Sequence, residues 1–229
     1  MSIRRTIIIS LGGSIIIPAK VDTAFLKKFR TVITEFAKKG FRFILVAGGG
    51  SVCREYQKAA KQIVPAMSAD DLDWIGIAST KMNAELVRTL FGKLAYYEVL
   101  HNPTKRVVTD KKILVGAGWK PGSSSDKDAI MLAQAYGADL VINLSNIRYV
   151  YTADPRKDKD AKPIARISWN DFLKLAGSKH VPGRHIPFDP EASKLAKQLG
   201  VKVVVCLGTD LVNVRKILSG AKFQGTLIE

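Results

Sequence analysis

The sequence predicts an α/β protein, with one domain over residues 1–229 built as a three-layer αβα sandwich around a mainly parallel sheet. Three observations favour this fold. Short, continuously apolar segments alternate with longer segments whose apolar residues recur every three or four positions. Several apolar segments run into glycine- or serine-rich turns that precede a helical pattern. The chain has 229 residues, of which 47% are hydrophobic, and this is enough for one large core.

The first strand–helix–strand unit is predicted over residues 6–46. Residues 6–11 are β-branched and apolar throughout, as expected for a strand covered on both faces. Asp22 can cap the next helix and Gly40 can end it. Residues 41–46 then form the second predicted strand, and the crossover between the two strands should be right-handed. The apolar stripe of the helix has spacings of three and four: Phe25, Leu26, Phe29, Val32, Ile33, Phe36 and Ala37.

The same alternation continues along the rest of the chain. Asp189 and Pro190 supply an N-cap and a first-turn proline for a helix that Gly200 ends. The polar residues 157–162 are expected to form an exposed loop. Further helices are predicted after Gly50, over residues 71–91 and over residues 126–136. Further strands are predicted over residues 95–99, 113–115, 140–143 and 201–207.

The chain is strongly basic. It has 36 Lys and Arg against 20 Asp and Glu, a formal net charge of +16, which attracts anionic partners over long distances. Nucleotides, nucleic acids and anionic membranes all fit this charge. Nothing resembles a helix-turn-helix or an aromatic-studded basic strand, so nucleic acid is an unlikely partner. No segment approaches the roughly 18 apolar residues of a membrane span, and the first residues lack a signal-peptide pattern.

The cysteines and histidines give no metal or disulfide pattern. Cys53 and Cys206 lie far apart, without a Cys-x-x-Cys motif, which argues against a disulfide framework and a zinc site. His180 and His185 have no ligand spacing with nearby carboxylates. A reducing cytoplasm is the expected location.

Three predicted strands run into turns suited to phosphate. In a parallel sheet these turns share the carboxyl edge, where glycine lets phosphate approach the backbone and helix starts attract anions. The P-loop, G-x-G-x-x-G and Gly-x-Ser-x-Gly motifs are all absent, which excludes P-loop kinases and Rossmann dehydrogenases and leaves a serine hydrolase little support. The turns are residues 11–14, 47–51 and 120–126.

These motifs, with others along nearly the whole chain, resemble the amino-acid-kinase family, and within it the archaeal-type branch of the UMP kinases. The order and spacing of the matching segments are more specific than any one of them. The matches are residues 9–14, 46–50 with Arg54 and Tyr56, 73–77, 83–84, 120–126, 146–155 (NIRYVYTADP), 188–190 and 225–228.

The resemblance implies transfer of the γ-phosphate of ATP to UMP, with Mg²⁺ assisting. It implies that residues about 1–145 form the half that binds the acceptor. In this half Asp73, beside Gly76, would accept hydrogen bonds from the ribose hydroxyls. Arg54 would hold the acceptor phosphate, Ser124 and Ser125 would lie near the uracil and that phosphate, and Asp126 would cap their helix. Glycines of two turns would contact phosphate: Gly12, Gly13, Gly49 and Gly50.

On the donor side, residues about 146–229, the resemblance places Asn146 near the ATP phosphates together with Gly12 and Ser14. The catalytic set is therefore expected to be Gly12, Gly13, Ser14 and Asn146, with no protein ligand for a metal. The adenosine of ATP would be bordered by Tyr151, Asp154 and Pro155. The family also implies a homo-oligomer, either a hexamer or a dimer-based assembly.

The sequence departs from the family pattern at two places. Many members carry a lysine that contacts the transferred phosphate where this chain has Ser10, although some archaeal-type sequences lack it. Arg148 stands where an acidic residue is usual, and Tyr149 replaces the usual glycine. Arg148 therefore either replaces the missing charge in the donor crevice or faces solvent.

Other functions stay open at this point. An isopentenyl phosphate kinase is the nearest rival, but its pattern has a histidine shortly after the second glycine turn, where this chain reads residues 51–56 without one. Acetylglutamate and carbamate kinases fit less well around Arg54 and Asp73. A non-catalytic nucleotide-binding or storage protein is a different class, motivated by Ser10 and Arg148. A nucleic-acid-associated regulator would rest on the net charge alone.

Overall fold

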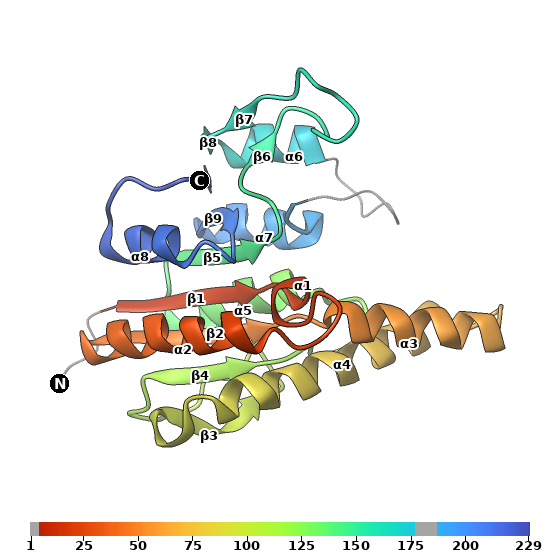
Figure 1. Ribbon diagram of the computed structural model, residues 1–229, viewed down its shortest axis with the longest axis horizontal. Coiled ribbons are helices and arrows are strands. Elements are labelled where there is room, and N and C mark those ends of the chain that lie inside the picture. The colour runs from red at the N-terminus through yellow and green to blue at the C-terminus, as the bar shows by residue number, and fades with distance from the viewer. Residues whose placement is uncertain (1–4, 177–186) are drawn as a thin grey trace.

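The computed structural model describes residues 5–176 and 187–229, which form an eight-stranded sheet between two layers of helices (Figure 1). The strand order is β3-β4-β2-β1-β5-β9-β10-β8. All neighbours pair in parallel except β9 and β10, which are antiparallel. The strands of this sheet are β1 (Arg5–Leu11), β2 (Phe41–Ala47), β3 (Ala95–Leu100), β4 (Ile113–Gly116), β5 (Leu140–Ser145), β8 (Arg166–Ile167), β9 (Lys202–Leu207) and β10 (Thr226–Ile228). The predicted three-layer, mainly parallel fold is confirmed.

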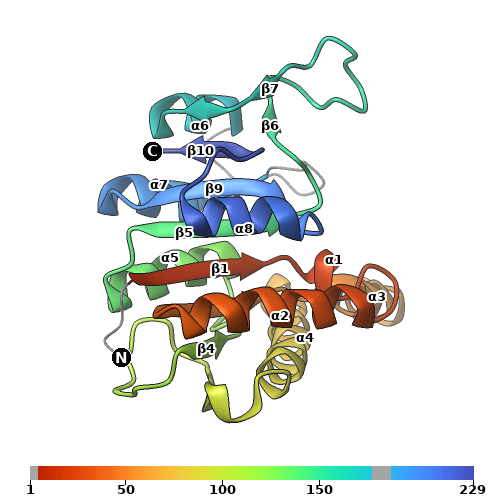
Figure 2. The same ribbon diagram turned by 60° about the vertical axis from the view of Figure 1, so that its left-hand side comes forward.

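Helices cover both faces of the sheet, as Figure 2 shows. A separate two-stranded hairpin joins β6 (Val150–Tyr151) to β7 (Pro163–Ile164). The helices on one face are α1 (Gly13–Ile16), α2 (Thr23–Lys38), α4 (Ala69–Thr89) and α8 (Leu211–Ser219), with α3 (Gly50–Ile63) packed on α1 and α4. Those on the other are α5 (Ser125–Tyr136), α6 (Trp169–Ala176) and α7 (Pro190–Leu199), and a short 3₁₀ helix, Gly92–Leu94, precedes β3.

The alternation of side chains along β1 explains why the sheet has a core on each face. Ile7, Ile9 and Leu11 join the core beneath α2, whereas Ile8 joins the core beneath α5 and α7. All four are at most 1% exposed. A strand with this burial needs a continuous apolar run, which is the pattern that predicted it.

Two helix starts differ from the sequence prediction. The helix predicted from residue 71 begins at Ala69, because the Ser68 hydroxyl accepts the Asp71 amide and caps it. The helix predicted from residue 126 begins at Ser125, and its N-cap is Ser124, which accepts the Lys127 amide. The expectation that Asp126 caps this helix is therefore wrong. Extended backbone at Ser124 directs its hydroxyl to the free amide, whereas Asp126 already lies inside the first turn.

The caps of α2 and α7 are as predicted. Asp22 accepts the Phe25 amide, and Asp189 accepts the Ala192 amide ahead of Pro190. Residues 157–160 are exposed, in agreement with the predicted loop. His180 and His185 lie outside the described residues. In the described ranges, none of the helices combines the length and apolar character that crossing a membrane requires.

We predict that Gly13→Ala destabilises the fold severely. A Cβ atom on Gly13 would lie 2.0 Å from the Gly50 backbone nitrogen, so two backbone segments would have to separate, at a cost of about 3 kcal/mol. Gly220→Ala is the control, because Gly220 has a positive φ of 73° but open space around it, and should cost about 1 kcal/mol. Urea unfolding measures both free energies. Equal losses in the two variants would show that the contact at Gly13 is unimportant.

Candidate functional site

The turns after β1 and β2 touch each other at the carboxyl edge of the sheet. The Gly48 amide donates to the Leu11 carbonyl over 3.0 Å, and the Gly12 amide donates to the Leu144 carbonyl at the end of β5 over 3.1 Å. Gly50 has a φ of +73° and faces Gly13, with no room for a side chain on either residue. The ends of β1, β2 and β5 therefore lie together at this edge of the sheet, and helices α1 and α3 begin there.

A buried asparagine on α4 fixes the second turn. The Asn83 side-chain amide, 1% exposed, donates to the Gly48 carbonyl over 2.7 Å and to the Gly49 carbonyl over 3.0 Å. Gly49 is the N-cap of α3, so the positive end of that helix dipole lies at this edge. Such a helix start attracts phosphate or carboxylate groups.

A pocket of about 140 Å³ lies next to this turn. The predicted acceptor residues Asp73 and Gly76 come from α4, and Ser125 comes from the start of α5. The Asp73 carboxylate accepts the Gly122 amide over 2.8 Å, which ties α4 to the loop before α5. The lining residues are Gly49, Cys53, Asp73, Gly76, Ile77, Thr80, Gly118, Ser123 and Ser125.

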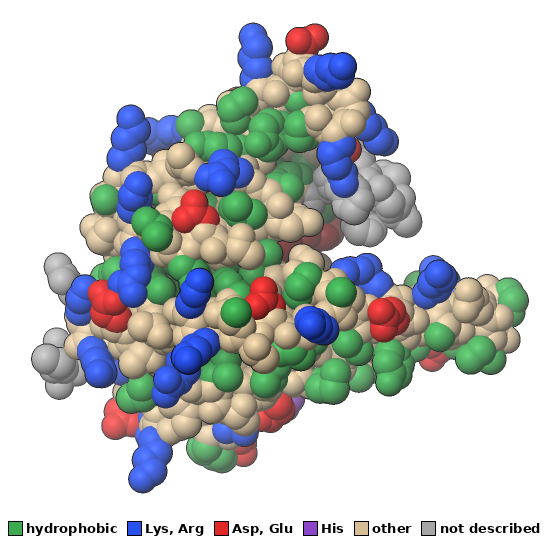
Figure 3. Space-filling view, in the orientation of Figure 1, with side chains coloured by type: hydrophobic (Ala, Val, Ile, Leu, Met, Phe, Trp, Pro, Cys, Tyr) green, Lys and Arg blue, Asp and Glu red, His purple; other side chains and the backbone are tan. Residues whose placement is uncertain are grey.

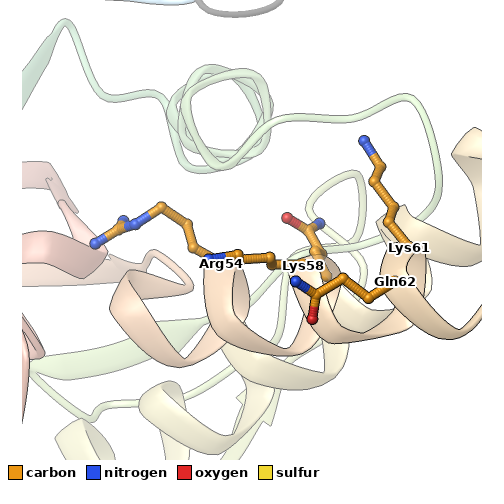
Figure 4. A pocket seen from close by; sticks show the side chains of 5 residues that line it. Arg54, Lys58, Lys61 and Gln62 are labelled. Atoms are coloured by element: carbon orange, nitrogen blue, oxygen red, sulfur yellow. The ribbon is translucent and has the colours of Figure 1, made fainter.

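Arg54 lies on the outer side of α3, exposed, one residue from Cys53 of the pocket. It lines an open groove of about 390 Å³ with Gln57, Lys58, Lys61 and Gln62, all from the same helix. Figure 4 shows the Arg54 and Lys61 side chains extending from α3 in different directions. Helices α3 and α4 project from the body of the molecule beside a hollow in this face (Figure 3). The basic groove lies close to the pocket, because Arg54 of the groove follows Cys53 of the pocket on α3.

Asp126 joins three elements beneath the turns. Its carboxylate accepts the Ser10 hydroxyl of β1 over 3.0 Å and the Asp189 amide, at the start of α7, over 3.2 Å. Burial raises the pKa of Asp126 to about 6, and the two hydrogen bonds partly offset that rise. Ser10 thus occupies the usual lysine position as a hydrogen-bond donor.

The donor residues are more dispersed. Asn146 follows β5 directly and is exposed at the same carboxyl edge. Tyr151 lies in the β6–β7 hairpin, in contact with Tyr149 at a ring distance of 6.4 Å. Asp154 is held by the backbone amide and guanidinium of Arg156, a pairing that lowers its pKa to about 2. Within the described residues, no hydrogen bond joins Tyr151 or Asp154 to the glycine turns, and Pro155 is exposed.

Arg148 faces α8. Its guanidinium donates to the Gln224 side chain and lies 3.6 Å from the carboxylate of Asp210, the N-cap of α8. The side chain is 44% exposed. Arg148 therefore bridges the end of β5 to the segment after β9 and does not point along the loop through Lys159.

Sequence reasoning gave no role to several residues that shape the site. Asn83, which lies in a matched segment, and Thr80 are buried polar residues on the face of α4 that packs on the sheet, and this break in an apolar stripe is a signal that the sequence contains. Asp128, two residues after Asp126, is fully buried. Cys53 lines the pocket, and no pattern in the sequence indicates this.

Comparison with known proteins identifies the family of this chain. The model of the amino acid kinase family matches residues 5–207. The chain belongs to the amino-acid-kinase family. This amino-acid kinase is 34% identical to a uridylate kinase of Methanospirillum hungatei, over 97% of this chain and 94% of the relative. It is 30% identical to a uridylate kinase of Pyrococcus abyssi, over 97% of this chain and 99% of the relative.

Two solved structures resemble the kinase. The uridylate kinase of Archaeoglobus fulgidus superposes with a TM-score of 0.84 at 30% identity, covering 97% of this chain and 99% of the other. The UMP kinase of Bacillus anthracis superposes with a TM-score of 0.79 at 20% identity, covering 98% of this chain and 96% of the other, and supports the fold alone.

We predict that Asp126 makes the stability of the kinase depend on pH. Because burial raises its folded-state pKa to about 6 from 3.8, the folded state binds the proton more tightly than the unfolded chain does. The resulting stabilisation is complete below the unfolded-state pKa and is lost as the pH rises through about 6. The unfolding free energy of Asp126→Asn minus that of the wild type should therefore increase from pH 4 to pH 7.

The measurement is urea unfolding at several pH values in that range. Thr31→Ala, an exposed change on α2 that removes no titrating group, is the control, and its difference from the wild type should stay constant. A constant difference for Asp126→Asn as well would contradict the raised pKa.

Proposed function

We propose that this amino-acid kinase is a UMP kinase, which transfers the γ-phosphate of ATP to UMP to give UDP and ADP. The observation that carries the proposal is the similarity to uridylate kinases over 97% of the chain. The pocket adds support, because Asp73, Gly76 and Ser125 line it together, as the family pattern requires of an acceptor site. The product would serve pyrimidine nucleotide biosynthesis.

On the acceptor side, UMP occupies the pocket between α4 and the start of α5. Asp73 accepts hydrogen bonds from the ribose hydroxyls, and Ser124 and Ser125 lie near the uracil and the phosphate. Arg54 reaches the acceptor phosphate from α3, where a planar guanidinium matches two phosphate oxygens. Gly49 and Gly50 let this phosphate approach the α3 N-terminus.

On the donor side, ATP lies across the ends of β1 and β5. Gly12, Gly13 and Ser14 of the first turn contact the transferred phosphate, and Asn146 lies near the phosphate chain. Tyr151, Asp154 and Pro155 border the adenosine, and the tie between Asp154 and Arg156 fixes the turn that presents them. Phosphoryl transfer has a loose transition state, so in-line positioning and charge neutralisation matter more than a general base.

We expect a magnesium ion that is held chiefly by the nucleotide. In the described ranges, no three acidic, cysteine or histidine side chains cluster in a way that could hold a metal, and Mg²⁺ commonly binds through phosphate oxygens and water. When bound, the ion neutralises charge on the phosphate oxygens.

The proposed UMP kinase function also implies an oligomeric state and a cellular compartment. We expect a hexamer or another dimer-based homo-oligomer, and a cytoplasmic enzyme. The two cysteines, Cys53 and Cys206, are both free, in agreement with a reducing compartment.

A non-catalytic nucleotide-binding protein is the second candidate. Two observations favour it. The Ser10 hydroxyl, at the position where many family members have a lysine, donates to Asp126, and Arg148 is paired with Asp210. Neither residue therefore offers an unpaired positive charge to the donor phosphates. A coupled assay for ADP release separates the two functions, because the binding protein would bind nucleotide without releasing ADP.

We predict that, with Mg-ATP, the kinase phosphorylates UMP with a higher kcat/KM than CMP, AMP or isopentenyl phosphate. The reason is that Asp73 and Ser125 at the start of α5 line one small pocket, which supports a site for a ribose and a pyrimidine. A coupled ADP-release assay over the four acceptors provides the measurement. Equal or better turnover of isopentenyl phosphate would overturn the assignment to UMP.

We predict that Arg54→Ala lowers kcat/KM for UMP by well over tenfold, because losing one partner of a charged hydrogen bond costs on the order of 2 to 5 kcal/mol. The KM for ATP should change less than about twofold, since an acceptor ligand does not touch the donor. Lys61→Ala is the matched control, because Lys61 is a cation of the same groove two turns further along α3. If Arg54→Ala behaves like Lys61→Ala, the acceptor phosphate binds elsewhere.

A further inference from the structure

The segment between β4 and α5, residues 117–124, is here named the acceptor loop. Its residues Gly118 and Ser123 line the pocket proposed for UMP. A loop in this position sets the shape of the pocket, so the contacts that hold it decide how well the acceptor is placed.

Asp128, on the first turns of α5, holds the middle of the acceptor loop. Its carboxylate accepts the Ser123 hydroxyl over 2.6 Å on one oxygen and the Trp119 amide over 3.1 Å on the other. The side chain is 0% exposed. Each oxygen thus binds one donor from the loop.

Helix α4 holds the same loop from the opposite side. The Gly118 amide donates to the Thr80 hydroxyl over 2.9 Å, and that hydroxyl donates in turn to the Ile77 carbonyl over 2.7 Å. The Gly122 amide donates to Asp73 over 2.8 Å. Gly122 has a φ of +74°, a conformation that favours glycine, so the turn that presents this amide depends on the backbone being held on both sides.

Packing alone does not explain why a carboxylate is buried at position 128, because the burial is energetically unfavourable. A buried carboxylate is unfavourable unless it is well paired, and the two side-chain and backbone partners of Asp128 in the loop are neutral. Burial raises the pKa of Asp128 to about 6, and the bonds from Ser123 and Trp119 oppose that rise. An apolar residue here would avoid the cost but would leave two loop donors without an acceptor.

We propose that Asp128 is the positioning residue for the acceptor: it fixes the acceptor loop so that the Gly122 amide orients the Asp73 carboxylate toward the ribose. This inference rests on the proposed UMP kinase function. Asp128 does not touch the substrate, and it acts through Ser123, Trp119 and Gly122. Loss of its charge frees the loop and disorders the acceptor side of the site, while the donor side across β1 and β5 is unaffected.

The test compares Asp128→Asn with Tyr136→Phe. Asparagine keeps the shape but can accept only one of the two loop donors. Tyr136 is the matched control, because it also lies on α5, is 6% exposed and accepts a loop amide, that of Val107, over 3.0 Å, but at the other end of the helix. Both variants lose a partly buried hydrogen bond, and only that of Asp128 lies next to the pocket.

Asp128→Asn should raise the KM for UMP about tenfold or more, since hydrogen bonds to charged groups are worth this much, and should leave the KM for ATP within about twofold. Tyr136→Phe should lower the melting temperature but should not raise the KM for UMP relative to the KM for ATP. In the double variant with Ser123→Ala, the effects of the two substitutions on the KM for UMP should not add, because the two side chains form one interaction. Equal changes in the KM for UMP and the KM for ATP, or additive effects in the double variant, would overturn the proposal.

Amide hydrogen exchange gives a readout that needs no catalysis. In Asp128→Asn the Trp119 and Gly122 amides should exchange about tenfold faster or more, and in Tyr136→Phe they should exchange at the wild-type rate. If the wild type fails to phosphorylate UMP, the proposed function is wrong, and the exchange rates still decide whether Asp128 holds the loop. Unchanged exchange at both amides in Asp128→Asn would overturn the positioning role.

Discussion

Gly13 and Gly50 lie in backbone contact between the ends of β1 and β2, and the arrangement of the site depends on this contact. A Cβ atom on Gly13 would lie 2.0 Å from Gly50, and one on Gly50 would lie 2.7 Å from the Gly13 carbonyl oxygen. The two turns can therefore meet at the same point of the sheet edge only because Gly13 and Gly50 have no side chains. Helices α1 and α3 consequently start side by side, so that two helix N-termini face one region where polyphosphate would be attracted.

The first turns of α5 carry two acidic residues that perform different structural tasks. Asp126 points toward β1 and the start of α7, linking the acceptor half to the donor half. Asp128 points toward the loop before its own helix. Carboxylates near a helix N-terminus are favoured by the helix dipole, which offsets part of the cost of burying two of them within three residues. Burial raises the pKa of both carboxyl groups to about 6, and their hydrogen bonds oppose that rise.

Two arginines of the proposed donor half are paired with acidic groups: Arg148 lies beside Asp210, and Arg156 holds Asp154. Ser10 donates its hydroxyl to Asp126. The basic groove on α3, lined by Arg54, Lys58 and Lys61, is by contrast lined by no acidic residue. The positive charge of this groove therefore lies beside the pocket proposed for the acceptor, where it can raise the local concentration of an anionic substrate.

The sequence by itself determined the layered fold and most element limits within a few residues, because these follow from apolar periodicity, turn residues and strand order. The resemblance to the family, and not those patterns, singled out Gly49, Asp73, Gly76 and Ser125, which line one pocket. It could not decide which polar side chain serves as a cap and which turns inward, as Ser124 and Asp126 illustrate. Nor could it reveal the partners of Asp128 or Arg148. Those contacts join residues distant in sequence or on opposite sides of a loop, and only the packing of α4, α5 and α8 against one sheet brings them within hydrogen-bonding distance.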